Sequence, residues 1–392
     1  MGGSAGIIAP TGPPGVRKGY SAALESVRAI AALLVFARHI AGRLVATGAD
    51  PGPPGFFESF AWGGQTGVTL FFVLSAFLLV PPFIAKAPAS IPRFFARRFL
   101  RLWPIYLFAV FVATAWNAES LGDFGDGLIY LVYGQSHWSL ITPLEPFSSV
   151  WWSLATEVQF YAVLGLCAFL GSRRFGRVVL GALLLFYAVA YAAFIATGFG
   201  IGDIGSSLSL RVSIFGRGWS FLLGGLAAWL YGRYGADWRA RLEKVGWLGK
   251  GGGDALIMLT VVGIGLLLMK VETIGTWPAE IEWHAWHIPE SALWAAFIIG
   301  LLVLPLRFRA LLVNRPLERL GILSYSFYLW HLPIIVAVGK GLGISSADPE
   351  IAEPALLVLA IVLSFAGTFA ASALTYRYIE KPFLLRKERL AE

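Results

Sequence analysis

Ten apolar runs divide this 392-residue chain, and most of them approach the length needed to cross a bilayer. A spanning helix needs about 20 mainly apolar residues. The chain is 57% hydrophobic and only 14% charged, whereas a soluble domain has about 25% charged residues. We therefore predict an all-α membrane protein, a polytopic bundle of about ten transmembrane helices. The expected spans are 23–46, 64–85, 102–117, 150–170, 178–197, 212–232, 254–269, 291–306, 320–339 and 354–376.

Basic residues are distributed unevenly between the connections. Alternate loops together with the two termini hold 24 of the 31 Lys and Arg residues, and the intervening loops hold only four. Loops rich in Lys and Arg stay in the cytoplasm, so we expect both termini to be cytoplasmic. The net charge of +8 is thus a topology signal, and we expect no nucleic-acid partner. The prediction is a multi-pass protein of the cell inner (plasma) membrane, with the lipid bilayer as a partner.

Domain organisation is expected to be simple. The Gly- and Pro-rich residues 1–19 predict a disordered cytoplasmic N-terminus. Residues 20–385 form one transmembrane domain, and 386–392 form a short cytoplasmic tail. The single Cys167 excludes an internal disulfide.

The first span contains the most informative pair of residues, Arg28 and His39. Ionisable residues in membrane helices are costly and usually face the bundle interior or a water-filled cavity. Eleven residues separate these two by roughly 16 Å along the helix and by about 20° around it. One helix face can therefore hold an anion at one depth and carry out proton chemistry at another.

Three further groups could carry chemistry. Arg98 and Arg101 share a helix face, which suits a phosphate clamp, although a lipid-headgroup anchor explains the same spacing. Glu157, inside the fourth span, could orient an imidazole or bind an acceptor hydroxyl, and a structural hydrogen bond is the alternative. His331 precedes Pro333, so a bond to a freed backbone carbonyl competes with a catalytic role.

An outer loop combines carboxylates, histidines and tryptophans over residues 277–287. Flat rings beside carboxylates suit a sugar, while interfacial tryptophans in a negatively charged outer loop are the alternative reading. His284 and His287 near two glutamates could suggest a metal site. Their setting among tryptophans argues against one, so we expect no metal.

Five motifs occur along nearly the whole chain, from about residue 22 to 385. They are Arg28 with His39; Phe71-Phe72-Val73-Leu74-Ser75-Ala76-Phe77-Leu78; Arg98-x-x-Arg101; Trp152-Ser153-Leu154-x-x-Glu157-x-x-Phe160-Tyr161; and Ser324-Tyr325-Ser326-x-Tyr328-Leu329-Trp330-His331-x-Pro333. In this order they resemble the acyltransferase-3 family of membrane-bound O-acyltransferases. Ala76 departs from the pattern, which has Gly after the Ser. We expect the stand-alone type, without an extracytoplasmic hydrolase-like domain.

The resemblance implies a ten-helix enzyme that takes an acyl group, commonly acetyl, from cytoplasmic acyl-CoA. Acetyl-CoA is then a co-substrate, and the acceptor is a hydroxyl of a glycan, a lipid-linked saccharide or a hydroxylated secondary metabolite. Arg28, Arg98 and Arg101 would bind the CoA phosphates. His39 would act as general base with support from Glu157, by direct transfer or through an acyl-His intermediate. The substrate-contacting candidates are Trp152, Ser153, Tyr161, Tyr328 and His331.

Two non-enzymatic functions compete with this interpretation. A His–Glu pair inside a membrane could couple proton movement to transport, and inverted repeats would favour a transporter. We find no such repeats. A flippase or scaffold for glycan lipids would bind the acceptor without consuming acyl-CoA. Release of CoA by the purified protein separates both from an acyltransferase.

Overall fold

The computed structural model is a bundle of helices, and it describes residues 14–45, 54–84, 90–119, 125, 127, 130, 144–171, 174–197, 212–274, 285–344 and 353–389. These ranges contain helices but no strand, as expected for an all-α membrane protein. The longer helices are α1 Pro14–Ile40, α3 Thr66–Leu79, α5 Ile91–Asn117, α7 Trp152–Gly171, α8 Arg174–Thr197, α10 Ile214–Leu242, α11 Gly253–Ile274, α13 His287–Val303, α16 Ser324–Gly341 and α17 Pro354–Thr375. The shorter helices are α2 Phe56–Trp62, α4 Pro81–Ile84, α14 Arg309–Leu312, α15 Arg315–Ile322 and α18 Lys381–Arg389.

Short irregular turns interrupt or extend these helices. A π-helical turn, η1 Ala41–Val45, continues α1 directly, and π-helical turns η6 Leu248–Gly252 and η7 Tyr376–Glu380 precede α11 and α18. A 3₁₀ turn, η5 Ser148–Val150, leads into α7. The expected disordered segment 1–19 falls mostly on residues 1–13, which lie outside the described residues, and α1 begins at Pro14.

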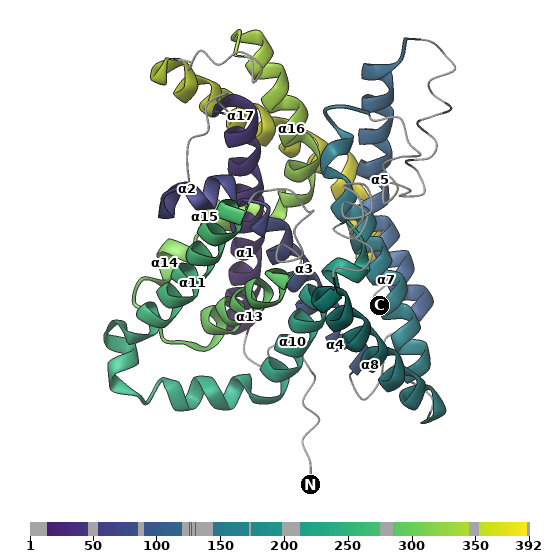
Figure 1. The fold of residues 1–392 in the computed structure, drawn as a ribbon, viewed down its shortest axis with the longest axis vertical. Coiled ribbons are helices and arrows are strands. Elements are labelled where there is room, and N and C mark those ends of the chain that lie inside the picture. Colours follow the sequence, from purple (N-terminus) through teal and green to yellow (C-terminus); the bar gives the residue numbers. More distant parts are fainter. Residues whose placement is uncertain are drawn as a thin grey trace.

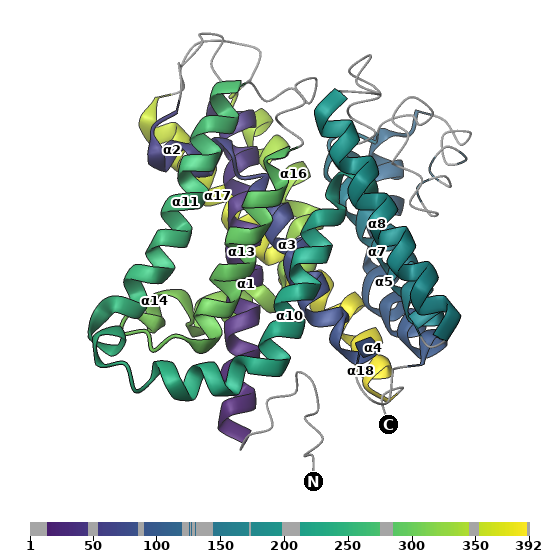
Figure 2. The same cartoon turned by 60° about the horizontal axis from the view of Figure 1, so that its bottom comes forward.

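The central helix is α3, which packs against α1, α10 and α13. Figure 1 shows α5, α7 and α8 together on one side of it and α1, α11 and α13 on the other. Most of the residues of α3 are buried, because these neighbours cover most of its surface. Figure 2 shows that the first turns of α1 and the short helix α18 lie at the same end of the bundle.

Small residues allow the central helices to approach closely. A Cβ atom at Gly67 of α3 would collide with the Ala31 carbonyl of α1, and one at Gly321 of α15 would collide with the Glu25 carbonyl. Close backbone approach at small residues is typical of membrane helices, where packing replaces the hydrophobic effect. The contact at Gly321 sets the start of α16 beside the first half of α1.

Each of the ten predicted runs overlaps a helix of the structure, but the helices are not all equally suited to span. By length and apolarity, six stretches of the described chain can cross a membrane, or seven if the bent pair α15–α16 counts as one. Helices α1 and α10 contain several charged residues, and α13 has only 17 residues. Six or seven stretches that can cross a bilayer make the molecule a multi-pass membrane protein. The count of ten spans is a proposal.

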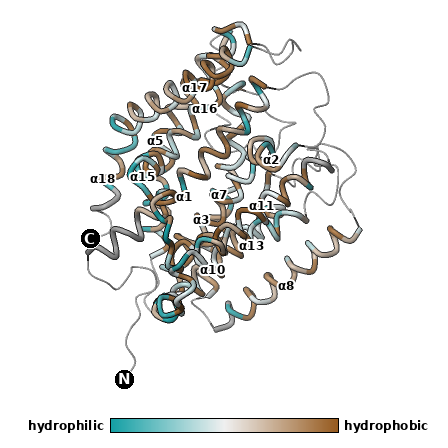
Figure 3. The backbone as a smooth tube through the Cα atoms, turned by 90° about the vertical axis from the view of Figure 1, so that its left-hand side faces the viewer, coloured by the Kyte–Doolittle hydropathy of each residue, from teal (hydrophilic) through white to brown (hydrophobic). Residues whose placement is uncertain are grey.

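Exposed apolar side chains mark the surfaces that face lipid. On α8, Leu184, Leu185 and Phe186 are exposed, as are Val358 and Val362 on α17. Figure 3 shows both helices at the edge of the bundle, with apolar residues along most of α17. Such surface is unfavourable in water but matches a hydrocarbon environment.

Candidate active site

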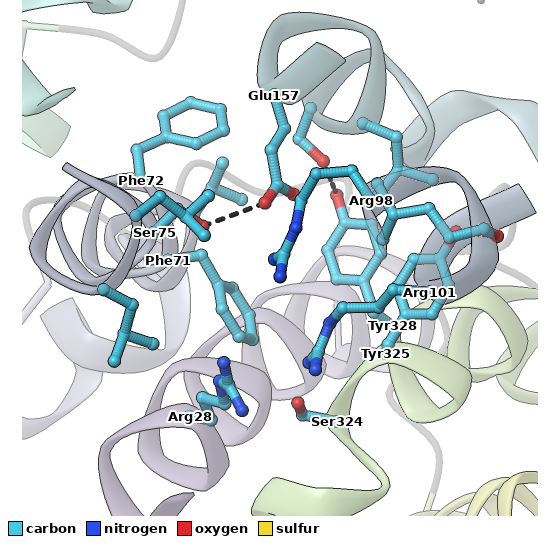
Figure 4. A pocket seen from close by; sticks show the side chains of 16 residues that line it. Arg28, Phe71, Phe72, Ser75, Arg98, Arg101, Glu157, Ser324, Tyr325 and Tyr328 are labelled. Atoms are coloured by element: carbon cyan, nitrogen blue, oxygen red, sulfur yellow. Dashed lines mark hydrogen bonds between the residues drawn. The ribbon is translucent and has the colours of Figure 1, made fainter. Parts of the chain in front are cut away.

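A cavity lies between α1, α3, α5, α7 and α16, and we call it the arginine cavity. Arg28 of α1 and both Arg98 and Arg101 of α5 line it. Figure 4 shows their guanidinium groups pointing into the same space, with Ser324 beside two of them. Three guanidinium groups around one cavity suit a polyanionic ligand, since guanidinium groups bind phosphate bidentately.

Glu157 is the carboxylate that lines this cavity. Its Oε1 accepts hydrogen bonds from Ser75 Oγ at 2.9 Å and from Tyr161 Oη at 2.5 Å. The bond from Ser75 crosses between α3 and α7 (Figure 4). Two donors on one oxygen fix the carboxylate, and its charge interacts with Arg98 and Arg28. Tyr161 therefore lies behind Glu157, outside the lining of the arginine cavity.

The start of α16 forms part of the wall of the arginine cavity. The helix axis bends by 72° between α15 and α16, so that Ser324, the first residue of α16, lines the cavity. A helix N-terminus carries partial positive charge. Arg28 also forms an ion pair with Glu25 at 2.7 Å, which holds its side chain against α1.

A second cavity adjoins the first, and we call it the histidine cavity. Val35, Arg38, His39 and Gly42 line it from one face of α1, since they are three or four residues apart. Its other lining residues are Arg43, Gln65, Val68, Ser149, Val150, Trp152 and Tyr328.

Tyr328 and Val68 line both cavities and so form the wall between them. The Tyr328 hydroxyl donates to the Val150 carbonyl at 2.6 Å and lies 2.7 Å from Ser153 Oγ. These bonds tie α16 to the start of α7. The cavities are thus neighbouring chambers separated by one fixed aromatic side chain and one valine.

His39 and His331 contact each other at this level. His331 Nε2 lies 3.1 Å from His39 Nδ1, and the ring centroids are 4.8 Å apart. His331 Nδ1 is 2.7 Å from the Tyr328 carbonyl, which can only accept, so this nitrogen carries the proton. In the neutral ring, His331 Nε2 is then an acceptor.

The hydrogen-bond partners of His39 define its tautomer in the same way. Its Nδ1 faces two acceptors, the Val35 carbonyl at 2.9 Å and His331 Nε2, and must therefore donate. The remaining nitrogen, Nε2, is unprotonated in the neutral ring. Because the His39 ring lines the histidine cavity, that chamber contains a side chain suited to accept a proton.

The predicted site residues fall into three groups. Arg28, Arg98, Arg101, Ser153, Glu157 and Tyr328 line the arginine cavity, and His39, Trp152 and Tyr328 line the histidine cavity. Tyr161 and His331 are not among the lining residues of either cavity. Tyr161 is hydrogen-bonded to Glu157, and His331 is hydrogen-bonded to His39. The described hydrogen bonds of Glu157 go to Ser75 and Tyr161, while the imidazole of His39 meets a second imidazole.

A buried polar cluster supports the back of the site. Arg217 Nη1 lies 2.8 Å from His287 Nδ1, which is 3.0 Å from Glu290 Oε2. The Arg217 guanidinium also covers the ring of Trp152, at 5.4 Å. The sequence shows charged residues inside apolar helices. It does not show that this cluster combines residues of three helices, α7, α10 and α13. Within the described chain, no three His, Cys, Asp or Glu side chains gather in a way that could hold a metal.

Several polar residues of the site were not singled out from the sequence. Ser75 lies inside a motif used for the resemblance, and Arg38 directly precedes His39. For Ser75 the available signal was its place in that motif. For Arg38 it was the neighbouring intramembrane histidine. Of the tryptophan-rich stretch 277–287, residues 277–284, including His284, lie outside the described residues.

Comparisons with known proteins show the family of this chain. The sequence model of a family described as an acyltransferase domain matches residues 21–377. A putative membrane-bound transacylase, BcsY of Komagataeibacter xylinus, is 30% identical over 302 residues, covering 72% of this chain and 69% of its own.

Two further relatives are named O-acetyltransferases. The putative peptidoglycan O-acetyltransferase YrhL of Bacillus subtilis is 26% identical over 390 residues, covering 93% of this chain and 55% of its own. The O-acetyltransferase OatA of Staphylococcus aureus is 26% identical over 344 residues, covering 82% and 52%. This chain therefore spans about half the length of these two relatives. No solved structure matches the chain significantly.

Proposed function

The chain belongs to the acyltransferase family that its sequence matches over residues 21–377, and on that basis we propose an acyl-CoA-dependent O-acyltransferase. The acyl group is acetyl in the first instance, since relatives matched over most of this chain are named O-acetyltransferases. The acceptor is a hydroxyl of a glycan, a lipid-linked saccharide or a hydroxylated small molecule. One observation carries the proposal: an arginine-lined cavity and a histidine-lined cavity meet at Tyr328.

The donor binds in the arginine cavity. Arg98 and Arg101 hold the CoA phosphates, and Arg28 binds an anionic oxygen deeper along the same path. Glu157 is the counter-charge that keeps these guanidiniums apart and oriented. The pantetheine arm then extends toward Tyr328, and the thioester reaches the wall between the chambers. The distance of roughly 16 Å between Arg28 and His39 along α1 suits an extended arm.

The acceptor binds in the histidine cavity, beside Trp152. His39 Nε2 takes the proton of the acceptor hydroxyl as the oxygen attacks the thioester carbon. The C–O bond forms, the C–S bond breaks, and the imidazolium returns the proton to the CoA thiolate. His331 is a positioning residue, because its Nε2 and the Val35 carbonyl both accept from His39 Nδ1 and together orient the ring with Nε2 unprotonated.

The membrane orientation follows from the charge of the loops. We propose ten spans in the cell inner membrane, with both termini and the arginine cavity on the cytoplasmic side. The Lys- and Arg-rich connections then face the cytoplasm, where acyl-CoA is made. Residues 1–19 precede the domain at 20–385, and 386–392 follow it.

The experiment uses purified protein in lipid nanodiscs with labelled acetyl-CoA and an envelope glycan extract. We expect release of the CoA thiol together with transfer of label to glycan. His39→Gln should abolish transfer, while acetyl-CoA still raises the Tm of the variant. Arg98→Ala should weaken acetyl-CoA binding, whereas Arg93→Ala, an exposed arginine on the same helix outside the cavity, should not.

The outcome also separates the competing functions. A transporter or flippase would consume no acetyl-CoA. Movement of glycan across the membrane of sealed vesicles without release of the CoA thiol would refute the proposed acyltransferase activity. Label found on His39 after a quench without acceptor would replace direct transfer by an acyl-His intermediate.

A further inference from the structure

The wall between the two cavities is the place where the acyl group has to lie during transfer. In the proposed reaction the donor arm comes from the arginine cavity and the acceptor hydroxyl from the histidine cavity, so the thioester carbon lies between them. Of the described residues, Val68 of α3 and Tyr328 of α16 line both cavities. With the CoA arm on one side and the acceptor on the other, the remainder of the acyl group must fit beside these two side chains.

The Tyr328 side chain is held in one position. Its hydroxyl donates to the Val150 carbonyl at 2.6 Å and lies 2.7 Å from Ser153 Oγ. Its ring packs nearly perpendicular to the Phe71 ring, with the centroids 6.3 Å apart, and its centroid is 5.6 Å from that of the His331 ring. The ring and the hydroxyl are both fixed, so the side chain cannot turn aside for a larger group without breaking these contacts.

Val68 is constrained by its own shape and by the packing of its helix. The residue is buried, with 4% of its surface exposed, and a valine in a helix has one strongly preferred χ1 rotamer. A Cβ at Gly67 would collide with the Ala31 carbonyl of α1, and one at Gly224 of α10 would collide with the Val73 carbonyl of α3. Close contact with two neighbouring helices therefore holds the backbone of α3 in place on either side of Val68.

We propose that Val68 limits the length of the transferred acyl group, so that the protein transfers acetyl in preference to longer acyl groups. This inference rests on the proposed function, because it concerns the donor of the same reaction. The methyl groups of Val68 and the rings of Phe71 and Tyr328 form an apolar surface, which suits the methyl group of an acetyl. A longer acyl group has to displace one of these fixed side chains. One methylene in a hydrophobic pocket changes kcat/KM by about 10- to 200-fold.

The test uses the full-length protein in nanodiscs with an envelope glycan extract and equal concentrations of acetyl-CoA and propionyl-CoA. Mass spectrometry of the glycans gives the initial ratio of the two products, which equals the ratio of kcat/KM for competing donors. Only active molecules contribute to this ratio, so partial misfolding of a variant does not distort it. Wild type should favour acetyl by at least about tenfold. Val68→Ala removes two methyl groups from the wall and should decrease this preference by about tenfold or more.

Two further variants separate acyl length from a general loosening of the bundle. Val73→Ala makes the same change at a buried valine of α3 that is not among the lining residues of either cavity. Its Tm should fall because a void is left in the core, while its product ratio stays that of wild type. Val68→Ile adds one methylene at the wall and should increase the preference for acetyl, which tests the proposal in the opposite direction if Val68→Ala is inactive.

Each outcome either supports or overturns the length limit. An unchanged product ratio in the Val68 variants, or an equal shift in Val73→Ala, would overturn it. Wild-type protein that transfers propionyl as readily as acetyl would do the same and leave the acyltransferase intact. Loss of all transfer in both Val68→Ala and Val68→Ile would assign Val68 to the packing of the bundle instead. If wild type releases no CoA thiol from either donor, the proposed function itself fails.

Discussion

Replacing His331 by leucine tests which of the two contacting imidazoles is the base. His331 Nε2 accepts from His39 Nδ1 at 3.1 Å, and the Val35 carbonyl accepts from the same nitrogen at 2.9 Å. Leucine removes the first acceptor and leaves the second. His39 therefore keeps its tautomer in the variant but loses part of the support that orients its ring.

The expected loss in rate is correspondingly moderate. One hydrogen bond contributes about 1 kcal/mol, which corresponds to roughly a fivefold decrease in kcat. Loss of a general base costs about 10²- to 10⁴-fold. The two roles thus differ by at least an order of magnitude in the expected effect. The KM for acetyl-CoA should not change, because the arginines lie in the other cavity.

The assay is thiol release measured under saturating acetyl-CoA, with Tm recorded for each variant. His331→Gln offers a carboxamide oxygen to His39 Nδ1 and should recover most of the rate lost in His331→Leu. His39→Gln should be inactive. If a folded His331→Leu protein is as slow as His39→Gln, the roles of the two histidines are reversed and our tautomer argument is wrong.

Three further predictions address other parts of the molecule. Arg98→Lys keeps the charge but loses the bidentate fork, so the KM for acetyl-CoA should rise about tenfold while kcat changes little; an unchanged KM would favour the lipid-anchor interpretation. Ser75→Ala removes one of the two donors to Glu157, and kcat/KM for acetyl-CoA should fall about fivefold; a gain in activity would contradict the orienting role. Arg241→Cys, in the last turn of α10, which we expect on the cytoplasmic side, should react with an impermeant maleimide only after permeabilisation, and labelling in intact cells would overturn the orientation.

Sequence reasoning succeeded where a relation lies within one helix. Arg98 and Arg101 are on one helix and line one cavity, and α1 carries both Arg28 and His39. Helical periodicity determines such relations, so they can be read from spacing. The resemblance to the acyltransferase-3 family was confirmed by the match over residues 21–377.

Relations between helices could not be read in the same way. His39 and His331 are 292 residues apart, and Ser75 and Glu157 are 82 apart. Whether two such side chains meet depends on the depth and rotation of packed helices, which close contacts such as that at Gly321 determine. The number of membrane spans was also hard to predict. Helices α1 and α10 carry charged residues, and these lower the mean apolarity by which a span is recognised.

The shared wall at Tyr328 has an electrical consequence. We propose that the arginine cavity opens to the cytoplasmic face and the histidine cavity to the outer face, in which case most of the transmembrane voltage falls across the layer around Tyr328, which lines both. A single charge crossing it would gain or lose about 2.3 kcal/mol per 100 mV. The acetyl group that crosses is neutral and CoA remains on its own side, but the hydroxyl proton that His39 passes to the CoA thiolate crosses this layer in the opposite direction, so each turnover moves one charge. A small side chain at position 328 would therefore be expected to make the membrane leaky to protons, measurable as a current, even if acyl transfer continued.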